Sequence, residues 1–237
     1  MTFDLTDRVA ALDWPALTRS LDERGYATTT PLLAPEECAA LRNLYADSKR
    51  FRSRVIMERH AFGKGEYQYF NYPLPGAVAH LREALYPNLA PIANRWSQSL
   101  GVAASYPERL KSFLERCHKA GQRRPTPLLL KYGPDDYNCL HQDLYGDLAF
   151  PLQATVLLSD PEREFTGGEF LLVEQRPRAQ SKGEVVRLFQ GQAVIFAVNH
   201  RPVQGKRGPY RVALRHGVSR LDRGERYTLG LIFHDAV

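Results

Sequence analysis

The first part of the chain has the hydrophobic spacing of amphipathic helices. One apolar stripe runs through residues 4–24 at about one side chain per helical turn: Val9, Leu12, Leu17 and Leu21. Gly25 follows where such a helix could end. Residues 26–33 then alternate loosely and are rich in threonine, which favours a short strand.

Further helices are expected between residues 35 and 118. Pro35 suits the first turn of a helix, and the residues after it form an apolar face: Cys38, Leu41, Leu44 and Tyr45. Residues 76–118 predict two helical pieces, because a glycine and a proline interrupt the pattern around 101–107. The basic segment 121–127 then ends the helical part of the chain.

After residue 127 the pattern changes to that of strands. Eight short apolar segments follow between turn residues: 128–132, the residues around 141, 153–159, 168–174, 185–189, 193–198, 211–218 and 227–234. Many short strands at this spacing are typical of an antiparallel sandwich or jelly roll. With the helices packed on one sheet, the sequence predicts a single α+β domain over residues 1–237, in which 1–127 form a helical buttress and substrate lid and 128–237 form the core.

Residues 49–75 differ from both halves. The segment starts with basic residues, has two glycines in its middle, and then carries four aromatic side chains: Tyr67, Tyr69, Phe70 and Tyr72. Its arginines and aromatics could form a lid that meets a substrate, for instance by stacking on a base. An edge strand whose aromatics cover the sheet is the simpler explanation for most of the tyrosines. Our hypothesis is that Tyr67 and Tyr69 contact the substrate.

Composition and charge narrow the class of protein. Of the 237 residues, 43% are hydrophobic and 24% charged, as in ordinary soluble globular proteins. No apolar run has the length of a membrane span, and residues 1–14 lack the apolar core of a signal peptide, so we expect a cytoplasmic protein. Three cysteines without metal-like spacing argue against a disulfide framework or a zinc knuckle. The net charge of +6 would suit a polyanionic partner, and equally a merely basic enzyme.

The chemically most specific stretch is His141-Gln142-Asp143, the only His-x-Asp of the sequence. On a strand, alternate side chains share a face, so His141 and Asp143 would project together. An imidazole and a carboxylate side by side are two thirds of the 2-His-1-carboxylate set that holds non-haem Fe(II). The third ligand would have to come from a later strand.

Three late histidines have a suitable position: His200, His216 and His234. His216 is followed ten residues later by Arg226, and Thr228 would share a strand face with that arginine. A guanidinium beside a hydroxyl is a suitable receptor for a carboxylate. The arginine that follows His200 lacks a hydroxyl partner, and His234 lies almost at the end of the last strand. We therefore choose His216.

This ordered set of motifs, with Gly167-Gly168 and residues 191–196 between its parts, resembles the Fe(II)- and 2-oxoglutarate-dependent oxygenase superfamily. The resemblance covers roughly residues 128–235, and the ten-residue interval from His216 to Arg226 is similar to that of the prolyl-hydroxylase-like branch. The resemblance implies a double-stranded β-helix with iron at its open mouth and N-terminal helices on the larger sheet. His141, Asp143 and His216 would then hold Fe(II).

The same resemblance implies a place for the co-substrate 2-oxoglutarate. Arg226 would bind its distal carboxylate with support from Thr228, and Tyr132 is similar to a family tyrosine whose hydroxyl reaches that carboxylate. The family reaction consumes O₂, releases succinate and CO₂, and hydroxylates a C–H group of the substrate.

Neighbouring residues receive simpler interpretations. Cys139 is expected to pack in the core rather than to act, and His60 to lie at the surface. Asn199 and His200 would either meet substrate at the rim of the site or serve a turn. His234-Asp235 is expected to be a structural end to the last strand.

The substrate is open between classes. Oxidative dealkylation of nucleic acid, as in DNA repair, is favoured by the net charge, by the aromatic group at 67–72, by the pair Lys206-Arg207 and by a set of arginines: Arg50, Arg52, Arg54 and Arg59. Hydroxylation of a protein side chain, of the prolyl type, is favoured by the ten-residue interval. A jelly-roll binding module without catalysis is the non-enzymatic alternative.

Overall fold

The computed structural model describes residues 5–161 and 163–237. Its α-helices are α1 (Leu5–Ala10), α2 (Trp14–Arg24), α3 (Pro35–Asn43), α4 (Gly76–Ser99) and α5 (Leu110–Lys119), with short 3-10 helices η1 (Leu44–Ala46), η2 (Ser48–Arg50) and η3 (Met57–His60). Its strands are β1 (Tyr26–Thr28), β2 (Phe51–Ile56), β3 (Gly63–Lys64), β4 (Glu66–Phe70), β5 (Leu128–Tyr132), β6 (Tyr137–His141), β7 (Leu152–Leu157), β8 (Phe165–Gly167), β9 (Phe170–Gln175), β10 (Lys182–Val186), β11 (Ala193–Ala197), β12 (His200–Gly205), β13 (Gly208–Val218), β14 (Leu221–Gly224) and β15 (Arg226–Leu231).

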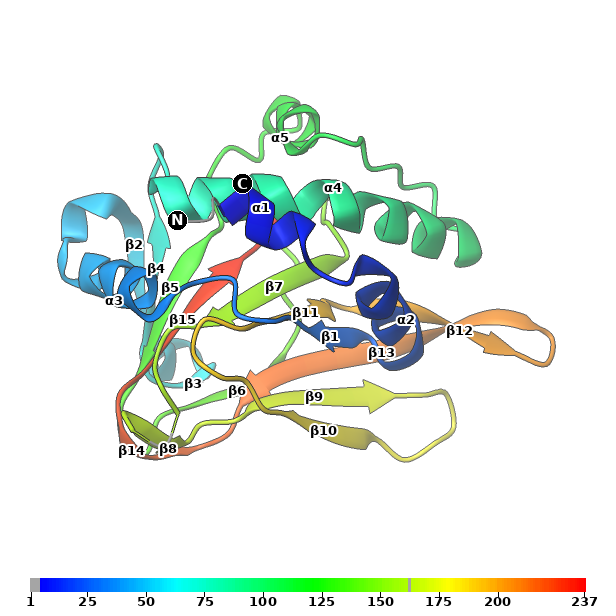
Figure 1. The fold of residues 1–237 in the computed structure, drawn as a ribbon. Helices are drawn as coiled ribbons and strands as arrows, with labels where there is room; N and C mark the ends of the chain where they lie inside the picture. The colour runs from blue at the N-terminus through cyan, green and yellow to red at the C-terminus, as the bar shows by residue number, and fades with distance from the viewer. Residues whose placement is uncertain (1–4, 162) are drawn as a thin grey trace.

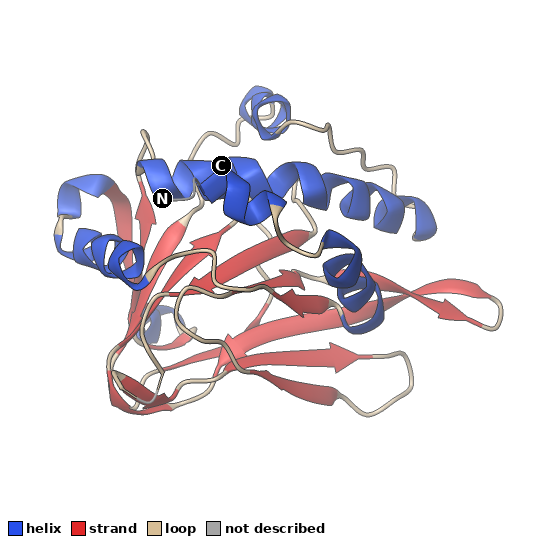
Figure 2. Ribbon diagram, viewed as in Figure 1, coloured by secondary structure: helices blue, strands red, loops and turns tan. Residues whose placement is uncertain are grey.

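Two antiparallel sheets form the body of the molecule. The larger has the strand order β1-β11-β7-β15-β5-β4-β2, and the smaller has the order β10-β9-β13-β6-β3, with β12 paired to β13. A short ladder of β8 and β14 lies at one end (Figures 1 and 2). Strands distant in sequence are neighbours in both sheets, as in a jelly roll. The predicted α+β class with a double-stranded β-helix is confirmed.

The strands of the larger sheet have two apolar faces, which places them between two layers. In β11, Ile195 joins the cluster shared with the helices, whereas Val194 and Phe196 join the cluster between the sheets. Successive side chains of a strand point to opposite faces. Such a strand therefore appears in the sequence as a continuous apolar run, as residues 193–198 do.

The helices cover the outer face of the larger sheet. Figure 1 shows α4 lying across this sheet with α1 beside it and α5 above it. The buried side of α4 includes Leu81, Leu85 and Leu89, which belong to the same cluster as Leu229 of β15. The expected helical buttress is thus present, and it leaves the inner face of the sheet free to form a site.

A buried ion pair fixes α4 to the end of the chain. The Arg82 side chain is 1% exposed, and its Nη2 donates to Asp235 Oδ1 at 2.9 Å, while its Nε donates to the Ile232 carbonyl at 2.8 Å. His118 of α5 contacts the other oxygen of the same carboxylate. The expectation of a structural role for residues 234–235 agrees with these contacts.

The helix expected over residues 4–24 is two helices, α1 and α2, and residue 4 lies outside the described residues. Asp13 separates them, because its carboxylate accepts a hydrogen bond from the Ala16 amide and so caps α2. The other helix predictions are confirmed. The helix from Pro35 is α3, and the break around 101–107 falls between α4 and α5.

Residues 49–75 supply two strands at one end of the larger sheet. β2 is the edge strand, and β4 pairs with β2 on one side and with β5 on the other. Tyr67 and Tyr69 lie in β4, so the expectation that these tyrosines belong to an edge strand is wrong, although their segment does extend the sheet. Since β1, β2 and β4 all belong to the larger sheet, residue 127 does not divide helices from core as expected. Four short strands were not predicted: β3, β8, β12 and β14.

Among the described residues, no helix combines the length and the apolar character that crossing a bilayer requires.

Candidate metal centre and its pocket

The three predicted ligands come together on the inner side of the smaller sheet. His141 ends β6 and His216 lies in β13, where the two are direct cross-strand partners with ring centroids 4.2 Å apart. Asp143 lies two residues beyond the end of β6. His141 and Asp143 do project together, as expected. They do so although Asp143 lies in the loop after β6 and not on the strand itself.

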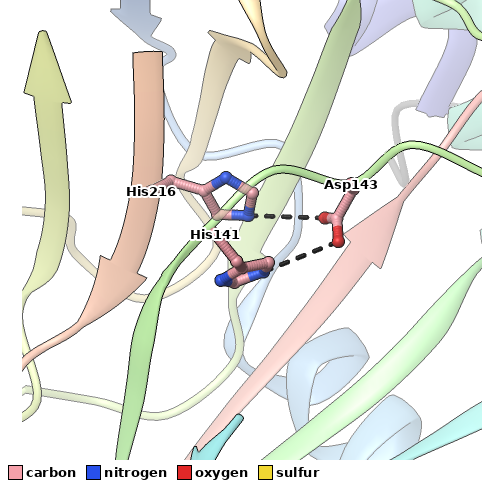
Figure 3. Close-up of side chains that lie close together, drawn as sticks. All are labelled: His141, Asp143 and His216. Carbon is pink, nitrogen blue, oxygen red and sulfur yellow. Dashed lines mark ion pairs between the residues drawn. The ribbon is translucent and has the colours of Figure 1, made fainter. Parts of the chain in front are cut away.

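The ligand atoms of these residues face one another (Figure 3). Nε2 of His216 is 3.4 Å from Asp143 Oδ2, and Nε2 of His141 is 3.5 Å from Asp143 Oδ1. One donor atom of each residue lies within 4.8 Å of the other two. Two imidazole nitrogens and a carboxylate converging from one side match the donor set of a facial Fe(II) site.

A hydrogen bond orients the first imidazole. Nδ1 of His141 lies 2.7 Å from the carbonyl oxygen of Cys139. Because a carbonyl can only accept, Nδ1 carries the proton, and Nε2 keeps its lone pair for the centre. Cys139 itself is exposed and lines the cavity, so the expectation that its side chain serves packing is wrong.

The electrostatic environment favours the metal-binding forms of the other two ligands. Burial lowers the pKa of His216 and outweighs the opposing effect of Asp143, so the imidazole is neutral. Burial by itself would raise the pKa of Asp143, but the contacts with His216, His141 and Tyr145 together hold that pKa below its usual value. The carboxylate is therefore ionised.

The predicted co-substrate residues lie in the same pocket. Arg226 and Thr228 are each 2% exposed, and β15 pairs Arg226 with Tyr132 of β5. The guanidinium carbon of Arg226 lies 5.6 Å from the centroid of the Tyr132 ring. Nη1 of Arg226 is buried without a hydrogen-bond partner, which is costly for a cation unless a ligand supplies the partner.

A cavity of about 370 Å³ joins these parts. It is lined by the triad, by Arg226, Thr228 and Tyr132, and by a wall of tyrosines: Tyr67, Tyr69 and Tyr145. The Arg52 guanidinium lies 4.5 Å from the centroid of the Tyr69 ring. Tyr67 and Tyr69 are therefore placed where the substrate hypothesis requires them.

The structure does not bring Asn199 and His200 to this cavity. They line a separate hollow of about 190 Å³, and the Asn199 side chain accepts a hydrogen bond from Gln142 Nε2 at 2.8 Å. The same Gln142 amide donates to the Leu214 carbonyl at 2.8 Å and so fixes the ligand loop to β13. His60 is exposed, as expected.

Three further pocket residues were not found from the sequence. Asn138 donates to the Tyr132 hydroxyl at 3.4 Å, Tyr145 donates to Asp143 Oδ1 at 2.8 Å, and Gln153 has a buried Oε1 without a hydrogen-bond partner. A polar residue at the head of the apolar run 153–159 was the available signal for Gln153. For Tyr145 the signal was its place two residues after Asp143.

The basic residues cited for a nucleic-acid partner are only partly free. Arg50 pairs with Asp47, and Arg54 pairs with Glu66. Residues 206–207 lie at the tip of the β12–β13 hairpin, which projects beyond the sheets in Figure 1. Near the pocket, Arg52 is the member of the predicted arginine set that contacts the tyrosine wall.

Comparison with known proteins places this site in a family. The model of the Oxygenase-NA family, described as "Oxygenase, catalysing oxidative methylation of damaged DNA", matches residues 65–236. The chain belongs to the Oxygenase-NA family. The match includes both sheets except β1, β2 and β3, with every residue of the triad and of the Arg226 subsite.

The chain is also similar to individual proteins. Two uncharacterized proteins of Mycobacterium tuberculosis, from strains CDC 1551 and H37Rv, are 54% identical over 167 residues, which is 70% of this chain and 72% of each relative. Among solved structures, a prolyl-4-hydroxylase of Pseudomonas putida aligns with a TM-score of 0.53 at 16% identity and covers 94% of this chain and 99% of its own. A prolyl hydroxylase of Trichoplax adhaerens, solved with a hypoxia inducible factor peptide fragment, aligns with a TM-score of 0.53 at 14% identity, covering 98% and 92%. These structures share the fold.

The predicted membership in the Fe(II)- and 2-oxoglutarate-dependent oxygenase superfamily is confirmed, and the chain is an oxygenase. The cofactor set of this superfamily is Fe(II), 2-oxoglutarate and O₂. The residues present fit it, because the triad supplies the donor set of non-haem iron and the unpartnered Nη1 of Arg226 suits a carboxylate.

Proposed function

We propose that this oxygenase removes alkyl groups from nucleic acid by oxidation, as a DNA-repair enzyme would. The observation that carries the proposal is the joint presence of the triad and the unpartnered Arg226 in one cavity, in a chain whose family is described as acting on damaged DNA. The non-catalytic alternative is set aside because the family is one of oxygenases.

In this proposal His141, Asp143 and His216 hold the iron. When bound, the iron would supply the oxidation of a substrate C–H group at the expense of 2-oxoglutarate and O₂, with release of succinate and CO₂. The protein itself positions the ligands. Nδ1 of His141 donates to the Cys139 carbonyl, which fixes the first imidazole. His216 packs against Phe196, with 4.6 Å between ring centroids, which fixes the second.

Arg226 binds the distal carboxylate of 2-oxoglutarate in this scheme. The guanidinium is buried, so a carboxylate that reaches it neutralises a charge which water cannot solvate. Thr228 lies on the same face of β15 and offers a hydroxyl, and the Tyr132 hydroxyl lies in the same pocket. Burial raises the pKa of Tyr132 to about 12, so its hydroxyl stays protonated and can donate.

Oxidation of an N-methyl group explains how such an enzyme would repair a base. One oxygen atom of O₂ is inserted into a C–H bond, giving N–CH₂OH, while the other enters succinate. The N–C bond of this product then breaks, with return of a proton to nitrogen and release of formaldehyde. The base is restored with its ring intact, and the protein needs no catalytic residues for hydrolysis.

The tyrosine wall supports a flat aromatic substrate. Tyr67 and Tyr69 meet edge to face with ring centroids 5.4 Å apart, and both line the cavity. Aromatic faces bind bases by stacking, and enzymes that act on a base take it out of the helix into a pocket of this kind. The buried Gln153 amide could hydrogen-bond the edge of such a base.

Turnover of 2-oxoglutarate with Fe(II) tests the substrate class. Wild type, His141→Ala and Arg226→Ala would each be assayed alone, with methylated single-stranded DNA, with the unmethylated strand and with a peptide pool. We expect succinate production to rise only with the methylated strand and to be lost in both variants. Stimulation by peptides alone would instead support protein side-chain hydroxylation, the function that the ten-residue interval from His216 to Arg226 favours.

A further inference from the structure

A chain of hydroxyl groups connects the tyrosine wall to a metal ligand. The Tyr69 hydroxyl donates to the Tyr145 hydroxyl at 3.0 Å, and the Tyr145 hydroxyl donates to Oδ1 of Asp143 at 2.8 Å. Tyr69 comes from β4, which lies between β5 and β2, whereas Tyr145 lies in the loop that carries Asp143. The two rings meet nearly perpendicular, with centroids 6.3 Å apart.

The donor and acceptor of each hydrogen bond in this series of hydroxyls follow from the single proton that each hydroxyl carries. An ionised carboxylate can only accept, so Tyr145 must direct its single hydroxyl proton to Asp143. Its oxygen then remains as an acceptor for Tyr69. Both hydroxyl protons are therefore used in these two hydrogen bonds. A hydroxyl that accepts a hydrogen bond also becomes a better donor.

We propose that Tyr145 is a positioning residue, which holds Asp143 so that the carboxylate offers one oxygen to the metal. The inference rests on the proposed function, because it requires the triad to bind iron. The hydroxyl of Tyr145 donates to Oδ1, which also lies 3.5 Å from Nε2 of His141, and Oδ2 faces Nε2 of His216 at 3.4 Å. Because the Tyr145 proton uses one lone pair of Oδ1, it favours Oδ2 as the oxygen that the metal would take. Without this donor the carboxylate is free to rotate and to chelate with both oxygens, which would fill a position that the co-substrate or O₂ needs.

Tyr69 connects the orientation of the Asp143 carboxylate to the wall of the cavity where substrate would bind. It is 8% exposed, lines the cavity and lies under the Arg52 guanidinium. A substrate that packs on this wall contacts the outer member of the chain, and the inner member contacts the ligand. We therefore expect Tyr145→Phe to have the larger effect on the metal and Tyr69→Phe a smaller effect of the same sign.

Metal binding by Tyr145→Phe tests the proposal without recourse to activity. Both phenylalanine variants keep the ring and remove one hydroxyl. The matched control is Tyr106→Phe, because the Tyr106 hydroxyl donates to the Ala149 carbonyl in the same loop at 2.9 Å but does not contact Asp143. Fe(II) affinity would be titrated anaerobically, and Co(II) would be used as a spectroscopic probe, since the intensity of its visible bands depends on coordination number.

Loss of an outer hydrogen bond to a metal ligand typically weakens metal binding by about 10- to 100-fold, and we expect a weakening of this size for Tyr145→Phe. We also expect a changed Co(II) spectrum in this variant and neither effect in Tyr106→Phe. Equal affinity and an identical spectrum in Tyr145→Phe and wild type would overturn the inference and leave the proposed function standing. Failure of wild type to bind either metal would overturn both. Should Tyr145→Phe not fold, Tyr69→Phe with the same control decides by the same readouts.

Discussion

At the scale of single residues, two buried arginines differ in what satisfies them. Arg82 is 1% exposed and has protein partners, among them Asp235. Arg226 is 2% exposed, and its Nη1 has none. Since a buried charge without partners destabilises a fold, the chain bears a cost at Arg226 that only a ligand would remove. This contrast is a physical reason to regard Arg226 as functional and Arg82 as structural.

Replacing each arginine by methionine should separate the two roles. We expect Arg226→Met to leave the melting temperature of the metal-free protein unchanged or higher. We also expect it to raise the KM for 2-oxoglutarate by about 10- to 100-fold, the value of one charge-assisted hydrogen bond. Arg82→Met should lower the free energy of unfolding by about 3–5 kcal/mol, because it leaves the buried Asp235 carboxylate without its arginine partner. Denaturant unfolding and co-substrate kinetics measure both. Equal destabilisation by the two substitutions would argue against a ligand at Arg226.

His234 predicts an acid-sensitive fold. Burial lowers its pKa to about 4, and its Nδ1 accepts a hydrogen bond from the Phe150 amide, so the folded protein holds this imidazole neutral. As pH falls below about 6.5 the unfolded chain takes up a proton that the folded chain refuses until about pH 4, so stability declines across this window. The decline due to this group is at most about 3 kcal/mol.

The matched variant is His234→Asn, whose amide oxygen can replace Nδ1 as acceptor and does not titrate. Its overall stability can differ from wild type, but the part of the slope between pH 6.5 and 4 that belongs to His234 should vanish. Denaturant unfolding of both proteins across this range measures the two slopes. Parallel slopes would contradict the assignment.

Several residues of the candidate site could be predicted from the sequence, and others could not. The sequence predicted the triad, Arg226 and Thr228 from a His-x-Asp motif and the spacing after His216, and Tyr132 from a family resemblance. The structure brings all of them to one cavity. Tyr145 was not predicted, since its hydrogen bond to Asp143 depends on the path of a loop, and loop paths have no periodicity to read. Asn199 and His200 were placed by proximity in sequence to a strand end, and the fold directs them to another hollow.

At the scale of elements, the tight turn between β8 and β9 determines where Arg226 can lie. Gly168 has φ +64°, and a Cβ atom there would stand 3.0 Å from Cδ of Arg226 and 2.7 Å from a methyl carbon of Leu221. Only glycine adopts this conformation without cost and leaves room for the arginine. The paired glycines in the sequence motif thus have a steric explanation.

Gly168→Ala should therefore damage both the fold and the co-substrate site. We expect a loss of about 1–2 kcal/mol of stability from the left-handed conformation and a higher KM for 2-oxoglutarate from the displaced guanidinium. Gly183→Ala in β10 is the control, because a Cβ there meets nothing within 4 Å. Thermal unfolding measures the stability of the two variants, and kinetics measure their KM for 2-oxoglutarate. A Gly168→Ala protein with the KM of wild type would contradict the steric account.

Element prediction succeeded where periodicity was strong and failed where tertiary pairing decides. The apolar runs of β7, β11 and β15 were all expected as strands, because burial on both faces leaves little polar sequence in them. β14 and β8 are held by pairing with each other rather than by a pattern of their own. The break at Asp13 was missed because the apolar stripe continues across it, whereas the capping carboxylate is a local signal.

At the scale of the whole molecule, the charge distribution sets how nucleic acid could bind. The net charge of +6 favours association with a polyanion. The ion pairs of Arg50 and Arg54 reduce the number of free cations near the tyrosine wall. A base held chiefly by stacking, with few phosphate contacts, is the binding mode that this distribution favours.

The salt dependence of binding checks this expectation. Affinity for methylated single-stranded DNA should fall with rising salt, with a logarithmic slope that corresponds to only a few phosphate contacts. Arg52→Gln should weaken binding and reduce the slope, because it removes the cation on Tyr69. Arg54→Gln is the control, since Glu66 already pairs that charge. Fluorescence titration over a range of salt concentrations gives both quantities, and an affinity independent of salt would contradict nucleic-acid binding.

In the proposed reaction, this oxygenase uses 2-oxoglutarate to remove an N-methyl group from nucleic acid. The most direct test of this claim is the ratio of formaldehyde to succinate when wild type and Asp143→Ala are incubated with Fe(II), 2-oxoglutarate, O₂ and methylated single-stranded DNA. We predict nearly equal amounts of the two products from wild type and neither from Asp143→Ala. Succinate at the same rate with and without the methylated strand, and no formaldehyde, would contradict the claim.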